Sequence, residues 1–487
     1  MLRTAIFGYR RGNAFIFSFC LLLLWAHGFA AEAPQATHYD LRINIVPTEA
    51  RMTGTAQITI SNTTGAALPE IHFLLYRLLS AEAADDEHGA PLAYRQAVVG
   101  MSDEKNLQVN AVSVRLRRPL RPGDTTKITL KYGGAIFGYR EVMPYVQDHI
   151  GEDYALLRQD ALAYPIPAEP SLRSLMATAD TRFTYRMEVT VPSGMTVACG
   201  GVLLSTSTDG TTETFRFVSG VPTWRMDIAA AKFKVLKNGA GNLVVYVLGE
   251  DEPRAVNLLT EMERVIEFYS SRFGPSERAK GYTVIETPEG YGSQAGDGYI
   301  TLAAEALRDP QGTYQIYHEI GHAWNARVAP ELRRVRWFDE AFASYFEALA
   351  VREFKGQKAF DDLMLQYRNR FRHDVQQNAR NASTAIAEYG TEELGENSYT
   401  KGAWSLFVLH EIVGDENFNQ IMRTFLSDFS ARPANFKDFR GVVAQVFGRD
   451  LSRYFDEWIF GTESSQLLLG NASIQEMVQR YREAPTR

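Results

Sequence analysis

The sequence predicts a multidomain α+β protein, in which an N-terminal antiparallel β-sheet domain is followed by a mainly helical domain. From about residue 36 to 235, apolar residues alternate with polar ones, which is the period of a half-buried strand. From Pro253 the period changes to that of a helix, and the chain after Gly312 is mostly helical. With 487 residues, 45% of them hydrophobic, the chain is long enough for two or three domains with substantial cores.

The first thirty residues have the pattern of a secretory signal. Three arginines precede an apolar stretch from Ala14 to Ala26, and small residues follow near position 30. The apolar stretch is shorter than the about 20 residues that span a bilayer. We therefore expect export to the periplasm or the exterior, and no stable membrane insertion once residues 1–30 are removed. An uncleaved anchor is the alternative.

The charge of the chain excludes two classes of partner. The formal net charge is −7, and it becomes roughly −10 without the three signal arginines. Nucleic acids and anionic membrane surfaces would repel such a chain, so neither is expected as a partner. Cys199 is the single cysteine after the signal, so no internal disulfide can form and stability must come from the cores. The composition does not specify an oligomeric state.

Alternating apolar residues place the β-sheet domain at residues 36–240. Turn signals such as Asn62-Thr63-Thr64-Gly65 and Pro192-Ser193-Gly194 separate the expected strands. The clearest runs with a period of two are Tyr39, Leu41, Ile43 and Ile45, then Ala56, Ile58 and Ile60, then Tyr185, Met187, Val189 and Val191.

The change of period places a second domain at residues 241–465. A strand is expected over 243–248, and a helix follows until Gly274-Pro275 ends it. Residues 282–286 and 298–302 are expected to be strands. Residues 466–487 are expected to form a helical tail, with a terminal helix over 473–482.

The second domain contains the segment His318-Glu319-Ile320-Gly321-His322. On a helix, imidazoles at i and i+4 project from one face and can reach one metal ion. This helix is expected to end at Ala329-Pro330. A second helix follows with Glu340 in its first turn, within the segment Trp337 to Glu347. The spacing therefore predicts a zinc site formed by His318, His322 and Glu340. The alternative is two core histidines and a surface glutamate.

Two histidines and one carboxylate leave zinc a position for water, whose pKa falls to about 7 in such sites. Glu319 is the candidate general base, which would take a proton from that water and pass it to a departing amine. Amide hydrolysis is the natural outcome. A closed structural zinc site is the other reading, but such sites are usually rich in cysteine. Tyr399 is the candidate donor to a developing oxyanion. A core-packed aromatic is the alternative for that residue.

These residues resemble the gluzincin metallopeptidases of the aminopeptidase N and leukotriene hydrolase type. Their third ligand follows the H-E-x-x-H motif after eighteen residues, whereas here residues 323–339 leave seventeen. The segment from Asp339 to Tyr345 fixes the register. Tyr399-Thr400-Lys401-Gly402-Ala403 matches the family's Y-x-K-G-A segment, whose tyrosine stabilises the transition state. The resemblance covers about residues 38–465. It implies one zinc ion, a thermolysin-like catalytic domain and Tyr399 as a catalytic residue.

One segment departs from that family. Gly292, Ser293, Gln294, Ala295 and Gly296 align with its G-A-M-E-N strand, which implies that they bind substrate, but Ala295 replaces the glutamate. In the family this glutamate anchors the substrate's free α-ammonium, and a desolvated ammonium needs an opposite charge. The nearby acids Asp160, Asp297 and Glu289 could supply it. The segment could instead bind the substrate backbone as an edge strand.

Together these features predict an exported zinc metallopeptidase that hydrolyses peptides or proteins, with aminopeptidase-like action. The missing glutamate keeps an endopeptidase as the second reading. His322-Ala323-Trp324-Asn325 also resembles the glycyl aminopeptidase gluzincins. A zinc-containing protein that binds peptides without turnover is a third reading. The presence of both Glu319 and Tyr399 argues against it, because such a protein has no chemical need for them.

Overall fold

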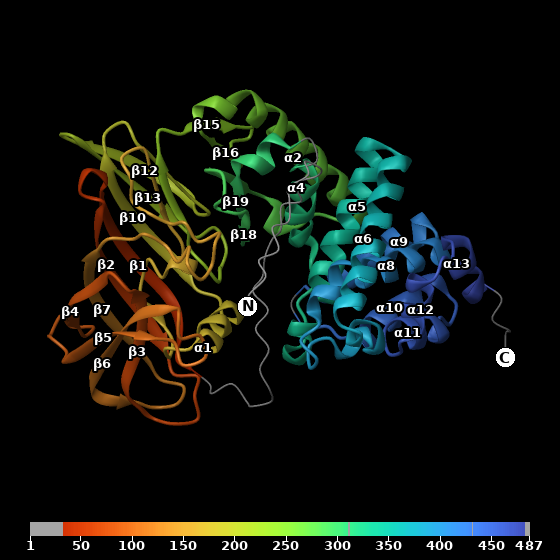
Figure 1. Cartoon of the computed structure of the whole chain (residues 1–487), viewed down its shortest axis with the longest axis horizontal. Coiled ribbons are helices and arrows are strands. Elements are labelled where there is room, and N and C mark those ends of the chain that lie inside the picture. Colours follow the sequence, from red (N-terminus) through yellow and green to blue (C-terminus); the bar gives the residue numbers. More distant parts are fainter. Residues whose placement is uncertain (1–32, 310–311, 431, 483–487) are drawn as a thin grey trace, which may run out of the picture.

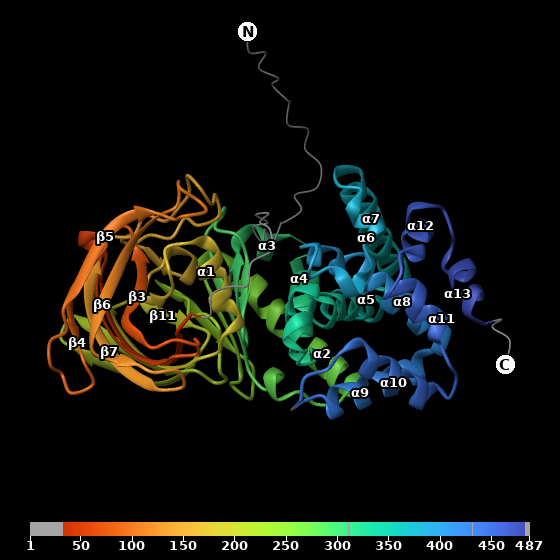
Figure 2. The same ribbon diagram turned by 90° about the horizontal axis from the view of Figure 1, so that it is seen from below.

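The computed structural model describes residues 33–309, 312–430 and 432–482, so the predicted signal lies outside the described residues. The chain forms two halves side by side along the longest axis of the molecule (Figure 1). The strands that precede β14 gather at one end and the later helices at the other, and the view turned by 90° shows the same division (Figure 2). The predicted order of a sheet domain followed by a helical domain is confirmed.

A seven-stranded sheet forms the larger layer of the β half. Its strands occur in the order β12-β13-β10-β1-β2-β7-β4, and all neighbours are antiparallel except β1 and β10, which are parallel. The expected alternation is visible in β1, where Tyr39, Leu41 and Ile43 are buried and their neighbours are more exposed. The strands are β1 (Gln35–Val46), β2 (Arg51–Ser61), β4 (Leu79–Asp85), β7 (Thr125–Gly134), β10 (Thr184–Pro192), β12 (Val202–Asp209) and β13 (Thr212–Val218).

Two smaller sheets complete the β half. A four-stranded sheet, β5-β6-β3-β9, shares one hydrophobic core with the seven-stranded sheet, in which Phe73 of β3 lies with Ile58 of β2. A three-stranded sheet, β11-β14-β8, lies at the junction with the second half. The strands are β3 (Leu68–Tyr76), β5 (Tyr94–Gly100), β6 (Gln108–Leu120), β8 (Tyr154–Leu157), β9 (Ile166–Pro167), β11 (Thr196–Cys199) and β14 (Ile228–Ala231).

A five-stranded mixed sheet opens the second half, in the order β15-β16-β17-β19-β18. Strands β16, β17 and β19 are parallel, and the two edge strands are antiparallel to them. The sheet begins at Lys234 rather than at the predicted boundary of 241, because β15 pairs with β16. Its strands are β15 (Lys234–Lys237), β16 (Leu243–Val247), β17 (Tyr282–Thr287), β18 (Gln294–Gly296) and β19 (Tyr299–Ala303).

Helices pack on this sheet and form the rest of the second half. The terminal helix expected over 473–482 is observed as α13. One short helix, α1 (Leu172–Ala177), lies in the β half instead. The helices of the second half are α2 (Glu252–Phe273), α3 (Ala304–Arg308), α4 (Gly312–Gly321), α5 (Phe342–Lys355), α6 (Gln357–Gln377), α7 (Arg380–Ser383), α8 (Lys401–Val413), α9 (Asp415–Asp428), α10 (Phe436–Phe447), α11 (Ser452–Trp458), α12 (Glu463–Leu469) and α13 (Ile474–Arg482).

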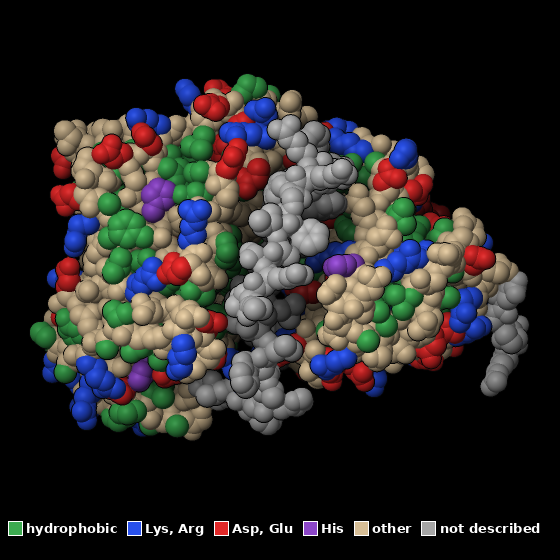
Figure 3. Space-filling model, viewed as in Figure 1, with side chains coloured by type: hydrophobic (Ala, Val, Ile, Leu, Met, Phe, Trp, Pro, Cys, Tyr) green, Lys and Arg blue, Asp and Glu red, His purple; other side chains and the backbone are tan. Residues whose placement is uncertain are grey.

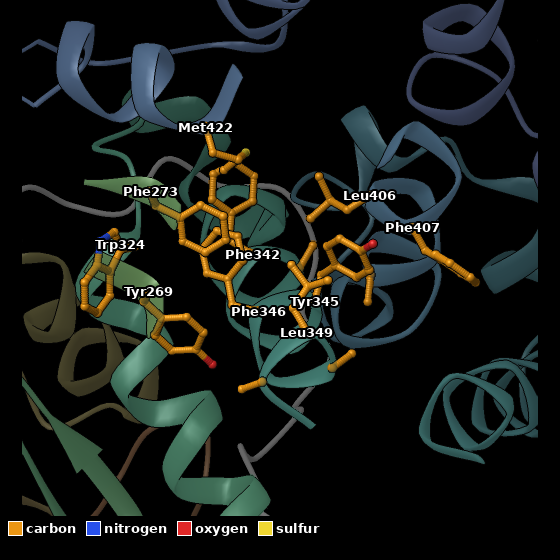
Figure 4. Close-up of a cluster of buried hydrophobic side chains, with 14 of the residues drawn as sticks. Tyr269, Phe273, Trp324, Phe342, Tyr345, Phe346, Leu349, Leu406, Phe407 and Met422 are labelled. Atoms are coloured by element: carbon orange, nitrogen blue, oxygen red, sulfur yellow. The ribbon is translucent and has the colours of Figure 1, made fainter. Parts of the chain in front are cut away.

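Helix α5 is the centre of the helical core. Phe346 of α5 meets Phe273 of α2 with ring centroids 4.3 Å apart, and another face of α5 directs Tyr345 toward Phe407 of α8 (Figure 4). Such aromatic pairs add to the free energy gained by burying their surface. Because α5 is buried on several sides, it holds fixed any residue at its N-terminal end.

The described part of the chain contains no helix that combines the length and the apolar character needed to cross a membrane. Acidic and basic side chains are interspersed over the face of the molecule seen in Figure 3. That face therefore presents no large field of a single sign.

A pair of buried carboxyl groups lies where β16 and β17 end. Glu286 is 1% exposed, and burial, together with the neighbouring Asp251 carboxylate, raises its pKa to about 7. Asp251 also pairs with Arg308 at 2.8 Å and Arg254 at 2.5 Å, while the Leu248 amide donates to Glu286 at 2.6 Å. Glu286 therefore holds a proton up to near neutral pH, whereas the arginines beside Asp251 lower the pKa of that carboxyl.

This pair predicts a pH-dependent stability. Because the folded-state pKa of Glu286 is raised, its contribution is complete below about pH 4.5 and is lost as pH rises through about 7. Glu286→Gln cannot ionise, so its unfolding free energy should exceed that of the wild type by about 1–3 kcal/mol at pH 8 and by much less at pH 5. Urea unfolding at both pH values measures this, with the exposed Glu277→Gln as control. An equal difference at the two pH values would contradict the raised pKa of Glu286.

Candidate metal centre

The two histidines come from the end of α4. His318 lies in the last part of α4, and His322 opens a 3₁₀ turn, η6 (His322–Trp324). The expectation that this helix runs to Ala329-Pro330 is wrong. The backbone becomes extended at Asn325, and the Trp324 indole N–H is held by the Gly274 carbonyl at 2.7 Å. The α-helix therefore changes to a 3₁₀ turn at the second histidine, and that turn ends at Trp324.

Glu340 comes from a π-helical turn, η8 (Trp337–Ala341), directly before α5. The sequence places it instead in the first turn of a regular helix. The wider turn follows Arg336, whose φ is +59°, and it buries both Trp337 and Phe338 in the aromatic core. Single π-turns occur often at functional sites because they redirect a side chain. Here the turn directs Glu340 toward α4.

The three predicted ligands converge. His318 Nε2 lies 3.1 Å from Glu340 Oε2, and His322 Nε2 lies 3.6 Å from the same oxygen. One ligand atom of each of the three residues lies within 4.8 Å of the others. Ligands about 2.0–2.2 Å from a tetrahedral zinc lie roughly 3.3–3.6 Å from one another. The donor set and its spacing therefore fit a zinc ion with a remaining position open.

Two further carboxylates hold the imidazoles in this orientation. Glu347 of α5 faces His318 Nδ1 at 3.3 Å, and Asp339 faces His322 Nδ1 at 2.8 Å. Such outer carboxylates fix the ring orientation and make the inner nitrogen a better ligand. Sequence reasoning missed both roles. The spacing of Glu340 and Glu347, seven residues apart on one helical face, was the available signal.

Arg336 is a third residue that sequence reasoning missed. Its guanidinium contacts the outer oxygen of Glu340 and also Glu396 at 2.9 Å. The burial of Glu340, which is 2% exposed, is thus compensated by a cation. The i, i+4 spacing of Arg336 and Glu340 was the available signal for the first contact, whereas no local pattern marks the contact with Glu396, sixty residues later.

Glu319 and Tyr399 both border the cluster. The Glu319 carboxylate is largely buried and lies 3.9 Å from His322 Nε2. Tyr399, at the end of the 3₁₀ segment η10 (Gly395–Tyr399), has its ring parallel to the His318 ring with centroids 5.6 Å apart. A side chain at Gly402 would lie 2.7 Å from the Ala341 Cβ, so glycine lets α8 approach the turn that carries Glu340.

The five predicted substrate-binding residues lie in and before β18, the edge strand of the five-stranded sheet. Gly292 has a φ of +69°, and Ser293 is buried with its hydroxyl accepting from the Ala303 amide. Gly296 leaves room for the Tyr299 ring, which a Cβ there would meet at 2.1 Å. Ala295 pairs with Ile300 of β19. The backbone edge of this strand is consequently the part available to a substrate.

Gln294 joins β18 to an ionic cluster in the β half. Its side-chain oxygen accepts from Arg158 at 3.2 Å and from Arg225 at 3.0 Å. Its amide nitrogen donates to Asp160 at 3.4 Å, and Asp160 pairs with Arg225 at 2.6 Å. Arg158 and Arg225 also pair with buried aspartates, Asp148 and Asp227 respectively. The cluster thus holds three aspartates against two arginines.

Each of the three acids considered as an amine anchor has a partner. Asp297 pairs with Arg182 at 3.4 Å, and Glu289, which is largely exposed, pairs with Arg308 at 2.6 Å. Asp160 differs because it belongs to the cluster with the surplus negative charge, and its side chain is 20% exposed while Asp227 is 1% exposed. It is therefore the acid in that cluster that a ligand can reach.

Comparison with known families decides the nature of the second half. Residues 303–458, which include the three predicted ligands, Glu319 and Tyr399, match the model of the peptidase family M1 domain. The chain carries an M1 peptidase domain. This confirms the resemblance to gluzincins of the aminopeptidase N type, and the M1 family implies zinc as the metal.

Curated relatives agree with the M1 assignment. The chain is 22% identical over 303 residues to probable aminopeptidase 1 of Sulfurisphaera tokodaii, which covers 58% of this chain and 38% of that protein. It is 26% identical over 218 residues to the leucyl aminopeptidase of Saccharolobus solfataricus, covering 40% and 27%. It is 22% identical over 478 residues to human glutamyl aminopeptidase, covering 89% and 47%. The chain thus spans less than half the length of each of these aminopeptidases.

Solved structures agree in fold. An M1 zinc metallopeptidase from Deinococcus radiodurans, crystallised as a mutant with a Tyr-Ser-Ala substrate, superposes with a TM-score of 0.60 at 20% identity, covering 88% of this chain and 94% of that one. The same enzyme without that substrate gives 0.60 at 18% identity, covering 91% and 94%. The order of a β-sheet domain followed by a helical M1 domain is therefore shared.

Proposed function

We propose that the protein is a metallopeptidase with one zinc ion that removes residues from the N-termini of peptides. The observation that carries this proposal is the convergence of His318, His322 and Glu340 with Glu319 beside them in an M1 domain. When bound, zinc would polarise the scissile carbonyl and lower the pKa of attacking water.

The residues of the chain then have separate tasks. Glu319 holds the proton released by water and moves it from its carboxylate to the nitrogen of the departing amine. The Tyr399 hydroxyl donates a hydrogen bond to the developing oxyanion. Because this bond forms only in the transition state, it lowers the activation barrier. Glu347 and Asp339 keep both imidazoles in the orientation that leaves Nε2 toward the ligand position.

Aminopeptidase action needs an anion for the substrate's ammonium group, and Asp160 is the proposed anion. The surplus negative charge of its cluster is the charge that an ammonium would balance. Asp160→Asn should raise KM for free peptides by about tenfold or more, since a charged hydrogen bond contributes about 1.5–3 kcal/mol. Asp297→Asn is the matched control and should leave KM unchanged. Steady-state kinetics on a free tripeptide measures both.

The loss of the family's glutamate at Ala295 favours a second candidate function, an endopeptidase that does not read the substrate's end. N-acetylated and free peptides separate the two. If wild type cleaves both equally well and Asp160→Asn has no effect, the endopeptidase replaces the aminopeptidase. If it cleaves only free N-termini, the aminopeptidase stands. Because His322-Ala323-Trp324-Asn325 resembles the glycyl aminopeptidases, the same assay should include peptides with an N-terminal glycine.

One digest tests the reaction class itself. The purified protein is incubated with a mixed peptide pool, with and without a chelator, and products are identified by mass spectrometry. We expect products shortened from the N-terminus, none of them after chelation, and recovery when zinc is restored. Intact peptides in every arm would favour a zinc-containing peptide-binding protein instead. We further propose that the protein acts after export, supported by the signal pattern of residues 1–30.

A further inference from the structure

Two arginines flank the candidate catalytic tyrosine. The guanidinium carbon of Arg336 lies 5.4 Å from the centroid of the Tyr399 ring, and that of Arg370 lies 5.7 Å from it. The same ring is parallel to the His318 imidazole. Two positive charges therefore lie beside a residue that borders the metal centre.

The two arginines differ in how their charges are balanced. Arg336 is paired with Glu340 and Glu396. Arg370 is exposed on α6, and within the described ranges no carboxylate lies within salt-bridge distance of it. Asp374, one turn later, is partly buried, and burial raises its pKa despite the opposing effect of Arg370. Arg370 is thus a cation without a paired anion next to Tyr399.

The position of Arg370 suits a carboxylate near the scissile bond. The rings of His318 and Tyr399 are 5.6 Å apart, and the Arg370 guanidinium carbon lies 5.7 Å from the Tyr399 ring centroid, so these two distances together set the greatest possible separation between Arg370 and the His318 ring. Such a span corresponds to about three residues of extended chain or fewer. A guanidinium that contacts an aromatic ring with its face can still bind a carboxylate through the N–H groups at its edge.

The positions of Asp160 and helix α6 in different halves of the molecule set the direction in which a bound peptide would run. Asp160, the proposed anchor of the amine, lies in the β half, whereas α6 lies in the helical half beyond α4 (Figure 1). A peptide anchored at its amine would direct its C-terminal part toward α6. Arg370 is then on the leaving-group side of the bond that is cut.

We propose that Arg370 is a specificity-determining residue that binds a substrate carboxylate one or two residues after the scissile bond. The preferred substrates are therefore dipeptides and tripeptides with a free C-terminal carboxylate, or peptides with an acidic side chain at that place. This inference rests on the proposed peptidase function, because it names the residue that binds the C-terminal part of the same peptide substrate.

Binding and turnover test the inference separately. Trialanine and trialanine amide are titrated by calorimetry into the zinc-loaded Glu319→Gln variant, which should bind without cleaving. We expect the free acid to bind about tenfold or more tightly than the amide, and Arg370→Gln in that background to abolish the difference. Arg370→Lys should restore part of it. In the catalytically competent chain, Arg370→Gln should raise KM for the acid and leave kcat nearly unchanged.

Lys358→Gln, which removes an exposed charge from the same helix, is the matched control and should have no effect. Alanyl-aspartyl-alanine amide separates the two sources of carboxylate. Arg370-dependent binding of this amide supports the proposal and extends it to side chains, while its failure to bind confines the site to the C-terminus. Equal binding of acid and amide by Arg370-containing protein overturns the proposal, even if the chain hydrolyses peptides. If the wild type hydrolyses no peptide but still binds trialanine more tightly than trialanine amide, the proposed function is refuted and the role of Arg370 stands.

Discussion

Glu319→Gln should leave zinc bound and lower kcat by about 10²–10⁴-fold. The residue contributes a carboxylate that accepts and returns a proton, and general acid–base catalysis typically supplies an effect of that size. Glutamine has nearly the same shape but cannot take the proton. Because Glu319 is not one of the three predicted ligands, zinc content measured by atomic emission should equal that of the wild type.

The comparison that makes this test specific is His322→Ala, which should lose both metal and activity. A Glu319→Gln protein that retains wild-type kcat would exclude this residue as the base. One that also loses zinc would show that the carboxylate holds the metal centre together. We expect neither of these two outcomes. The Glu319 carboxylate lies 3.9 Å from His322 Nε2, so it is beside the predicted ligands but is not itself a fourth ligand.

Arg158→Met should reduce the free energy of unfolding by about 3–5 kcal/mol. Arg158 and Asp148 are both fully buried and paired at 2.8 Å, so the substitution leaves a buried carboxylate without its cation. The same arginine donates to the Tyr145 carbonyl, to the Tyr291 carbonyl in the loop before β18, and to the Gln294 side chain of β18. It thereby joins the β half to the edge strand of the second half. Urea unfolding measures the loss.

The control is Arg95→Met, which removes an exposed arginine from a two-bond pair with Glu70. Surface pairs contribute at most about 1 kcal/mol, so a small change is expected. The double change Asp148→Asn with Arg158→Met should recover part of the loss, because the unpaired charge is removed with its partner. Equal losses for Arg158→Met and Arg95→Met would contradict the buried-charge argument.

Local spacing was sufficient to predict the elements that carry the site. The i, i+4 histidines and the periodic apolar residues after Glu340 identify two adjacent helices, and the alternating residues from Tyr39 identify the first sheet. These signals depend on residues a few positions apart, which is the range over which helix and strand periods act. The end of α4 and the π-turn at Glu340 were missed because packing of Trp324 and Trp337 decides them.

By itself the sequence determined the chemistry: which residues can bind zinc, which can act as a base, and that the family's amine-binding glutamate is replaced by Ala295. Only the tertiary structure decided which charges surround that chemistry. Asp160 meets Gln294, Arg336 meets Glu396, and Arg370 meets Tyr399 across separations that no periodic pattern reports. Electrostatic neighbours are set by how the halves and helices pack, so their roles follow from the folded chain.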